Sequence, residues 1–381
     1  MRSRFSYVVL LIVLLATPAA WAADAAFQDG PPPIQSMSTL AFGPEGVLLV
    51  GDAKGGAVVA LDLQDTDKTT PVERFGVGDL ETKIAALVGT RTSEVLIHDL
   101  ATHPISGAVY LAVSRGRAKW ESRWSLPNDL ADASILLRID GEAKLDEVDL
   151  SGVRWAKADL PDPVDPQQLH RWKDGVPLRA EMITDLVYDD GMVWVAGLSN
   201  EEFSSALWQV PYPFSARASK TTVEVFHGAH GKWETHSPVR TFVPYELAGK
   251  KQILAAYLCT PLAVFDRAAL KDGDHVKGRT VAEFGSGNFP LDMVVYEKGG
   301  KEKLLIANSM LPLMIVDLAD VEAFEGEITS APGTYTAGVP YEIRSPVGIQ
   351  QLDRLDDKRL VALQRMPSGT LDLVAMSFIR F

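Results

Sequence analysis

Cysteine is nearly absent from this sequence, which has one, Cys259, among its 381 residues. A single cysteine cannot form an intramolecular disulfide, and it excludes the C-x-x-C and C-x-x-C-H signatures of redox and haem proteins. The stability of the fold must therefore come from a packed core, which a chain of this length can bury. The thiol could still be a small buried apolar group, a metal ligand, an intermolecular bridge or a covalent attachment point.

Positive charge is also scarce, since 37 Lys and Arg face 50 Asp and Glu and the formal net charge is -13. Phosphate binding needs a cationic face, so we expect no nucleic-acid partner. Neither long helical stripes nor a G-x-S-x-G nucleophile elbow occurs, and the segment "GSGNFP" precedes a strand rather than opening a phosphate-binding helix.

The N-terminus has the three parts of a secretory signal. Residues 1–22 contain Arg2 and Arg4, then the apolar run "YVVLLIVLLA", and end in Ala20-Trp21-Ala22. The apolar run is shorter than the roughly 20 residues that a bilayer span needs. We therefore expect cleavage after Ala22, a periplasmic or secreted mature protein, and no integral membrane span once the signal is removed.

A unit of three short strands recurs along the mature chain, in which an often acidic residue opens the first strand and a strongly apolar second strand follows a tight turn. The six copies begin at Ser38, His98, Thr184, Arg240, Leu291 and Val347. Each has room for a fourth strand, as in "TTVEVFH" and "RTVAEFG". Blades that cannot bury both faces alone pack around a channel, so the sequence predicts an all-β fold, a β-propeller with four-stranded antiparallel blades.

Six copies favour six blades, with seven if the stretch between Asp99 and Asp185 holds another. We instead expect insertions at about 115–132 and 151–180, flanking the mouth of the channel. Residues 37–381 would then form one propeller domain, and the N-terminal segment 23–36 is a candidate for the strand that closes the last blade, because open sheet edges otherwise remain.

One copy, "HDLATHPISGAVYLAV", with its D-L opening and S-G turn, resembles the blades of secreted bacterial propellers of the NHL and YVTN kinds. The six-bladed gluconolactonase and soluble quinoprotein glucose dehydrogenase groups share this architecture. The resemblance covers the repeat pattern over most of the mature chain and includes no functional motif. It implies the fold, whereas many unrelated activities occur on such folds.

Aligning the copies places one residue of each at the start of an innermost strand: Thr39, Asp99, Asp185, Thr241, Asp292 and Gly348. We expect Asp99, Asp185 and Asp292 to line one mouth of the channel. Carboxylates that converge from separate blades could hold a hard cation such as Ca²⁺. Alternatively, each aspartate caps its own turn or accepts bonds from backbone amides of the neighbouring blade.

Loops that follow each second strand should reach the same mouth. They make Asn200, Glu201, Asn308 and Arg115 candidate neighbours of the aspartates, or ordinary turn residues. In the gluconolactonase group, a carboxylate and asparagine set holds the channel metal, and Asp99, Asp185, Asp292, Asn200 and Asn308 look similar. In a quinoprotein-like site, His98 and Arg115 could be the base and the cationic clamp, although His98 could equally be a neutral channel residue.

The stretch "HGAHGKWETHSP" places three histidines in one loop before Cys259. His227, His230, His236 and Cys259 offer imidazoles and a thiolate, a donor set that suits copper or zinc. Their spacing matches no strong motif, so a polar structural loop is the competing interpretation.

Two classes of function remain open. The first, which we favour, is an exported module that binds a small molecule or a protein at the polar, acidic channel mouth, with or without a metal ion. The second is an enzyme that uses the same mouth, either a metal-dependent lactonase-like or esterase-like hydrolase or a quinoprotein-like oxidoreductase.

Overall fold

A computed structural model describes residues 26–115, 133–171, 175–259 and 261–381. Its regular structure is almost entirely antiparallel β-sheet. The predicted signal segment and the predicted insertion at 115–132 lie outside these residues, apart from Arg115. In the described chain, no helix is both long and apolar enough to cross a membrane.

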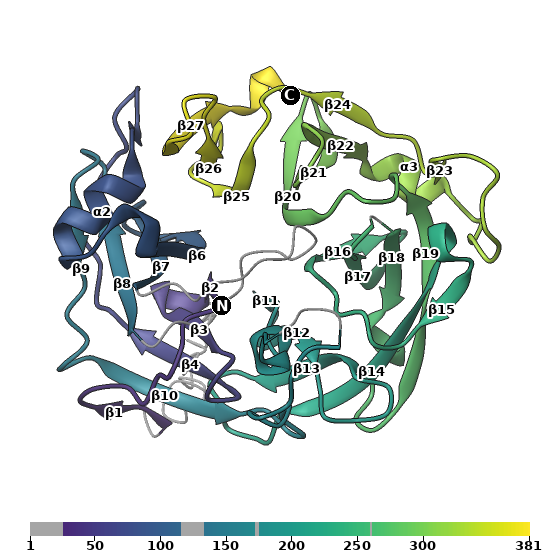
Figure 1. The fold of residues 1–381 in the computed structure, drawn as a ribbon, viewed down its shortest axis with the longest axis horizontal. Helices are drawn as coiled ribbons and strands as arrows, with labels where there is room; N and C mark the ends of the chain where they lie inside the picture. The colour runs from purple at the N-terminus through teal and green to yellow at the C-terminus, as the bar shows by residue number, and fades with distance from the viewer. Residues whose placement is uncertain (1–25, 116–132, 172–174, 260) are drawn as a thin grey trace, which may run out of the picture.

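The strands form six blades of four strands each around a centre, which confirms the predicted β-propeller (Figure 1). In chain order, the first three blades are β2 (Thr39–Phe42), β3 (Leu48–Asp52), β4 (Ala57–Asp62) and β10 (Arg154–Asp159); β6 (Val95–Thr102), β7 (Val109–Arg115), β8 (Ala133–Ile139) and β9 (Leu145–Glu147); and β11 (Asp185–Asp189), β12 (Met192–Leu198), β13 (Ser205–Pro211) and β14 (Ser219–His227).

The last three blades are β16 (Thr241–Leu247), β17 (Lys250–Ala256), β18 (Pro261–Asp266) and β19 (His275–Glu283); β20 (Pro290–Lys298), β21 (Lys301–Asn308), β22 (Leu313–Asp317) and β24 (Glu342–Arg344); and β25 (Ile349–Arg354), β26 (Arg359–Arg365), β27 (Leu371–Ser377) and β5 (Gly76–Val77). The smaller elements are β1 (Gln28–Asp29), β15 (Lys232–Glu234), β23 (Ala337–Gly338), α2 (Leu80–Val88) and α3 (Leu318–Ala323).

The blades do not follow one another around the ring in chain order. The innermost strands contact each other in the cycle β2, β6, β25, β20, β16, β11 and back to β2. The second blade therefore lies between the first and the last, as Figure 1 shows. The chain builds three strands of blade one, crosses to blade six, builds blade two, and returns to blade one with β10.

This path corrects two expectations about closure and insertions. The last blade is closed by β5, which pairs with β27, whereas β1 in the 23–36 segment pairs with β10 of the first blade. The segment 151–180 is not simply an excursion, because its residues Arg154–Asp159 pair along the full length of β4. Without β10, the apolar strand β4 would be an open edge.

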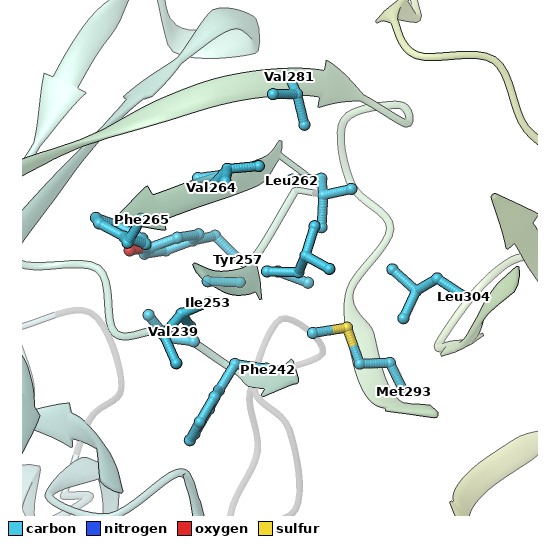
Figure 2. Close-up of a cluster of buried hydrophobic side chains, with 14 of the residues drawn as sticks. Val239, Phe242, Ile253, Tyr257, Leu262, Val264, Phe265, Val281, Met293 and Leu304 are labelled. Atoms are coloured by element: carbon cyan, nitrogen blue, oxygen red, sulfur yellow. The ribbon is translucent and has the colours of Figure 1, made fainter. Parts of the chain in front are cut away.

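The hydrophobic core consists of side chains that pack between adjacent blades. In blade four, Phe242, Tyr257 and Phe265 are each about 1% exposed and pack with aliphatic residues of neighbouring strands (Figure 2). The central strand β3 is buried at every residue, as expected for a strand covered on both faces. Each large side chain buried in this way contributes about 1.5 to 3 kcal/mol to folding.

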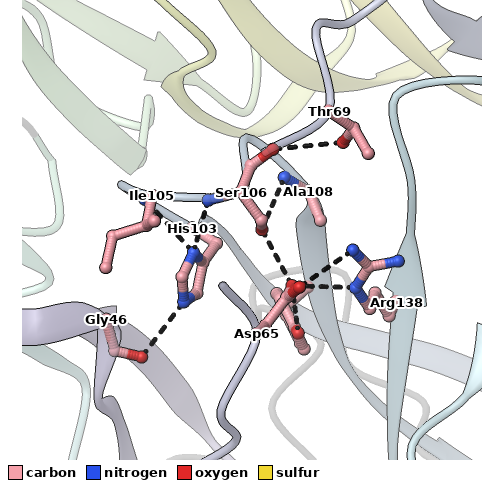
Figure 3. Close-up of polar contacts among 9 residues, drawn as sticks. Gly46, Asp65, Thr69, His103, Ile105, Ser106, Ala108 and Arg138 are labelled. Atoms are coloured by element: carbon pink, nitrogen blue, oxygen red, sulfur yellow. Dashed lines mark hydrogen bonds and ion pairs between the residues drawn. The ribbon is translucent and has the colours of Figure 1, made fainter. Parts of the chain in front are cut away.

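Hydrogen bonds connect residues 63–75, the segment that crosses from β4 to β5, to blade two. The Asp65 carboxylate accepts bonds from Ser106 Oγ at 2.8 Å, Tyr110 OH at 2.8 Å and Arg138 Nε at 2.9 Å (Figure 3). Burial alone would raise the pKa of this carboxyl, but these donors outweigh it and hold the pKa below its usual value. Asp65 thus links the crossing segment to blade two.

Candidate functional site

A cavity of about 460 Å³ occupies the centre of the ring and is lined by residues of all six innermost strands. It contains Asp99, Asp185 and Asp292, the three aspartates that the repeat register places at one mouth. A fourth, Asp353, lines it as well. The predicted convergence of the three aspartates on the channel is therefore observed.

The four aspartates connect neighbouring blades. Each innermost strand has a free edge toward the channel, and a carboxylate of one blade accepts a backbone N–H of the next. The acceptor–donor pairs are Asp99 Oδ2 with Leu40 N at 2.7 Å, Asp185 Oδ2 with Phe242 N at 2.9 Å, Asp292 Oδ2 with Leu352 N at 2.8 Å, and Asp353 Oδ2 with Thr102 N at 2.7 Å. The geometry thus shows the alternative in which these carboxylates accept backbone amides of the neighbouring blade.

Burial and mutual repulsion disfavour the ionised form of these carboxyls. Burial raises the pKa of Asp99 well above its usual value, and the nearby Asp185 raises it further. Burial likewise raises the pKa of Asp292, with added repulsion from Asp99 and Asp185. Burial raises the pKa of Asp185 to about 7 and that of Asp353 to about 6. The amide donors act in the opposite direction, since they stabilise a carboxylate.

Two further polar groups, His98 and Arg240, line the cavity. His98 shares a hydrogen bond of 2.8 Å with Ser114 Oγ, and burial lowers its pKa to about 4, so the imidazole is neutral near pH 7. Burial lowers the pKa of Arg240, while Glu181 and Asp185 act to raise it. The Nε of Arg240 is buried and has no hydrogen-bond partner. His98 is therefore a neutral residue of the channel lining at this pH.

The alignment of the sixth copy with the other five was wrong. The position expected for Gly348 is occupied by Gln351, whose side-chain amide donates to the His98 carbonyl at 3.0 Å. The pairing of β25 with β26 shifts between Ile349 and Gln351, just as the corresponding pairings shift before Asp99 and Asp292. The irregularity is therefore common to three blades, and the alignment simply began the sixth copy three residues too early. Asp353 was missed because it lies two residues beyond the opening position, where the other five copies have alanine or valine.

The structure does not bring the predicted loop residues to the cavity. Asn308 is buried, where its amide donates to the carbonyl of Ile306 and its oxygen accepts from Asn288. Arg115 donates to the Val88 carbonyl, and Asn200 is exposed. None of these three is among the lining residues within the described chain. Only Asn308 has the local contacts of a turn residue, because its amide also faces the Pro312 carbonyl.

The histidine stretch forms a compact turn at the end of blade three. His227 ends β14, the short 3-10 helix Gly228–His230 follows, and β15 pairs back on β14, with Val225 opposite Glu234. The rings of His227 and His230 lie 3.9 Å apart between centroids. One nitrogen from each ring and the Cys259 Sγ lie within 4.8 Å of one another. Three of the four predicted ligands thus come together.

The fourth predicted ligand lies elsewhere, because His236 Nδ1 is hydrogen-bonded to Ser204 Oγ at 3.0 Å. Cys259 lies in the turn after β17 in a left-handed conformation with φ 61°, which a non-glycine residue rarely adopts. It is partly exposed, which does not fit the alternative of a small buried apolar group. Strand directions place the His227 turn at the end of blade three where Asp185 lies, as predicted.

Two carboxylates surround the cluster. Glu234 accepts from His227 Nδ1 at 3.0 Å and from His230 Nδ1 at 2.6 Å. Burial raises its pKa, but the bonds to the two imidazoles dominate and hold the pKa at about 2. Glu283, at the end of β19, accepts the Gly228 N–H through Oε1, and its Oε2 is buried without a partner. Burial raises the pKa of Glu283.

Comparison with known proteins finds distant structural likenesses. No protein-family model matches the chain, and no curated protein matches it either. Among solved structures, an oxidoreductase described as a glucose dehydrogenase from Thermus thermophilus is similar at 13% identity and a TM-score of 0.38, over 92% of this chain and 99% of that one.

The PQQ-bound aldose sugar dehydrogenase from Streptomyces coelicolor is similar at 11% identity and a TM-score of 0.36, over 92% of this chain and 98% of that one. These values are too low to bear on activity. The six blades around a central cavity define the class of this chain as a six-bladed β-propeller protein. Its second blade in chain order lies between the first and the last in space.

Proposed function

We propose that this protein is an exported binding protein whose channel takes a small organic cation, such as an aliphatic amine. The observation that carries the proposal is the conflict at Asp99 and Asp292. Each carboxyl accepts two backbone amides, an arrangement that favours the ionised form. Burial and the neighbouring aspartates nevertheless raise both pKa values. A positively charged ligand removes this conflict.

The positive side chains that line the cavity lie beside other carboxyls. The charge of Arg240 acts to lower the pKa of Asp185, and the charge of Arg354 acts to lower the pKa of Asp353. No cationic side chain of the described residues is among the main influences on Asp99 or Asp292. The acidic net charge of the whole chain would also raise the local concentration of cations near the mouth.

An ammonium group suits these carboxylates better than calcium does. Ca²⁺ needs six to eight oxygens at about 2.3 to 2.6 Å, which requires carboxylates that can turn toward one point. Here each carboxylate is oriented by amides of two blades. An N–H donor can use a remaining lone pair at about 2.8 Å without disturbing those bonds. Calcium, a protein ligand and the two enzyme alternatives from the sequence remain untested predictions.

Isothermal titration calorimetry tests this proposal, with the linear diamine putrescine as the probe. Glucose and Ca²⁺ are titrated separately, because they represent the competing interpretations of the channel. We expect saturable binding of the diamine, tighter at pH 8 than at pH 6, with release of protons as the carboxyls ionise. Asp292→Asn should weaken binding by about 10-fold or more, because a buried charged hydrogen bond is lost. Asp67→Asn, an exposed control, should bind normally.

Two outcomes would reject the amine. One is calcium binding in the micromolar range without diamine binding, which would favour the metal interpretation of the channel. The other is equal binding of glucose and diamine, since a neutral polyol cannot relieve the repulsion between carboxylates.

A further inference from the structure

We propose that His227, His230 and Cys259 bind one transition-metal ion of the kind that prefers nitrogen and thiolate ligands, zinc or copper. The three donors come from two blades and from chain segments about 30 residues apart, and they lie within 4.8 Å of one another. None of them lines the central cavity in the described chain. The proposal is therefore independent of the amine site in the channel.

An unpartnered buried nitrogen points to a ligand at this cluster. His227 is 2% exposed, and its Nε2 has no hydrogen-bond partner. A polar atom left without a partner in the interior destabilises the folded state. Its Nδ1 is engaged by Glu234, so Nε2 is the atom left to coordinate. A metal ion would satisfy it.

Glu234 orients both imidazoles for coordination. Its Oε2 accepts from His227 Nδ1 and its Oε1 from His230 Nδ1, which places a proton on each Nδ1 and leaves Nε2 as the nitrogen that can offer a lone pair to a metal. Metal-binding histidines usually have such a carboxylate on the second nitrogen, where it fixes the tautomer and increases the basicity of the ligand. Glu234 is thus a positioning residue.

Glu283 completes the surroundings from the fourth blade. Its Oε1 holds the backbone at Gly228, the start of the turn that carries His230. Its Oε2 is buried without a partner, and the carboxyl lies close enough to His227 for the two groups to interact electrostatically. The two carboxylates would offset part of the charge of a divalent ion bound between the imidazoles and the thiolate.

The donor set selects the metal. Two imidazoles with one thiolate suit zinc and copper, whereas calcium and magnesium require oxygen ligands. Three protein ligands leave a fourth position for water or a small anion. Coordination converts the Cys259 thiol to a thiolate, so each bound ion releases one proton to solvent.

Modest movement would close the site. Zn–N and Zn–S bonds of about 2.0 to 2.3 Å bring tetrahedral ligands to about 3.5 Å from one another, so the donors must approach by about 1 Å. His230 can move, because its side chain is 45% exposed and lies on a short 3-10 turn. Cys259 lies in a turn that is also partly exposed.

Cobalt(II) titration of the untagged, chelator-treated protein is the first test. A tetrahedral Co²⁺ site with a thiolate gives a sulfur-to-cobalt charge-transfer band, and we expect it to saturate at one equivalent and to disappear when Zn²⁺ is added. Competition with zinc and copper chelators then distinguishes the two metals. A spectrum without the thiolate band would overturn the proposal.

Matched variants separate the cluster from adventitious binding. Cys259→Ser and His230→Gln should each weaken Zn²⁺ binding at least 10-fold, and Glu234→Gln by about 10 to 100-fold. His236→Gln is the control, because this histidine belongs to the same stretch but bonds Ser204 outside the cluster. Unchanged zinc affinity in Cys259→Ser, or equal loss in His236→Gln, would refute the site, with folding of each variant checked by circular dichroism.

Discussion

Replacing Asp185 with asparagine should change how the stability of the protein depends on pH. Burial raises the pKa of this carboxyl in the folded state to about 7, against a usual value of 3.8. Well below pH 3.8 the carboxyl is protonated in both states and contributes nothing. As the pH rises, it ionises freely in the unfolded chain but not in the folded one, so the wild-type protein loses stability.

The size of this loss follows from the shift. Three pKa units correspond to about 4 kcal/mol at 1.36 kcal/mol per unit, an upper value because the side chain retains some contact with the cavity. About 2.5 kcal/mol of this falls between pH 5 and pH 8. The asparagine side chain has no charge, so the variant should lack this loss, and its stability relative to wild type should rise by that amount across the interval.

The substitution also has an effect that does not vary with pH. The Asp185 carboxylate accepts amide N–H groups of Phe242 and Leu186, and asparagine can accept only through its one oxygen. The variant should therefore be offset by about 1 to 3 kcal/mol of destabilisation at every pH. The diagnostic quantity is therefore the slope, against pH, of the difference in unfolding free energy between the variant and wild type. A constant destabilisation does not change this slope.

Urea unfolding of both proteins at several values between pH 5 and pH 8 measures this slope, and equal m-values would show that the denatured state is unchanged. The surface variant Asp67→Asn should run parallel to wild type. If the difference in unfolding free energy between Asp185→Asn and wild type does not change with pH, the pKa of Asp185 in the folded state is near its usual value. A difference that falls with pH would show that Arg240 stabilises an ionised Asp185, and either result would refute the reasoning.

Three further predictions concern the fold. Asp65→Asn should lower stability by about 3 kcal/mol, because it leaves the partly buried Arg138 without its anion, and urea unfolding should show the loss at neutral pH but less of it in acid, where Asp65 is protonated. Deleting 154–159 should abolish soluble, cooperatively unfolding protein, since β10 covers β4; retained cooperative unfolding would mean that the segment is dispensable as an insertion. Gly197→Ala should destabilise by several kcal/mol, because an added Cβ would lie 1.9 Å from the Met182 carbonyl oxygen, and a calorimetric Tm within a degree or two of wild type would contradict this close approach.

The local pattern of the sequence determined the blades and much of the channel. Strands with apolar residues on both faces, such as β3, have to be buried on both sides, and short strands separated by tight turns lead to four-stranded antiparallel blades. A repeated residue at the start of each innermost strand placed Asp99, Asp185 and Asp292 at the channel, because repeats with one register present equivalent positions to the centre.

The tertiary structure alone decided the order of the blades and the role of the aspartates. Repeat patterns are nearly the same in every blade, so they do not say which blades are neighbours; that depends on long-range contacts such as β5 with β27, β10 with β4, and Asp65 with Arg138. Whether an aspartate holds an amide or a ligand depends on which atoms of the next blade lie beside it. His227 and Cys259 likewise meet, and His236 does not, only because β14 and the turn after β17 end at the same place in space.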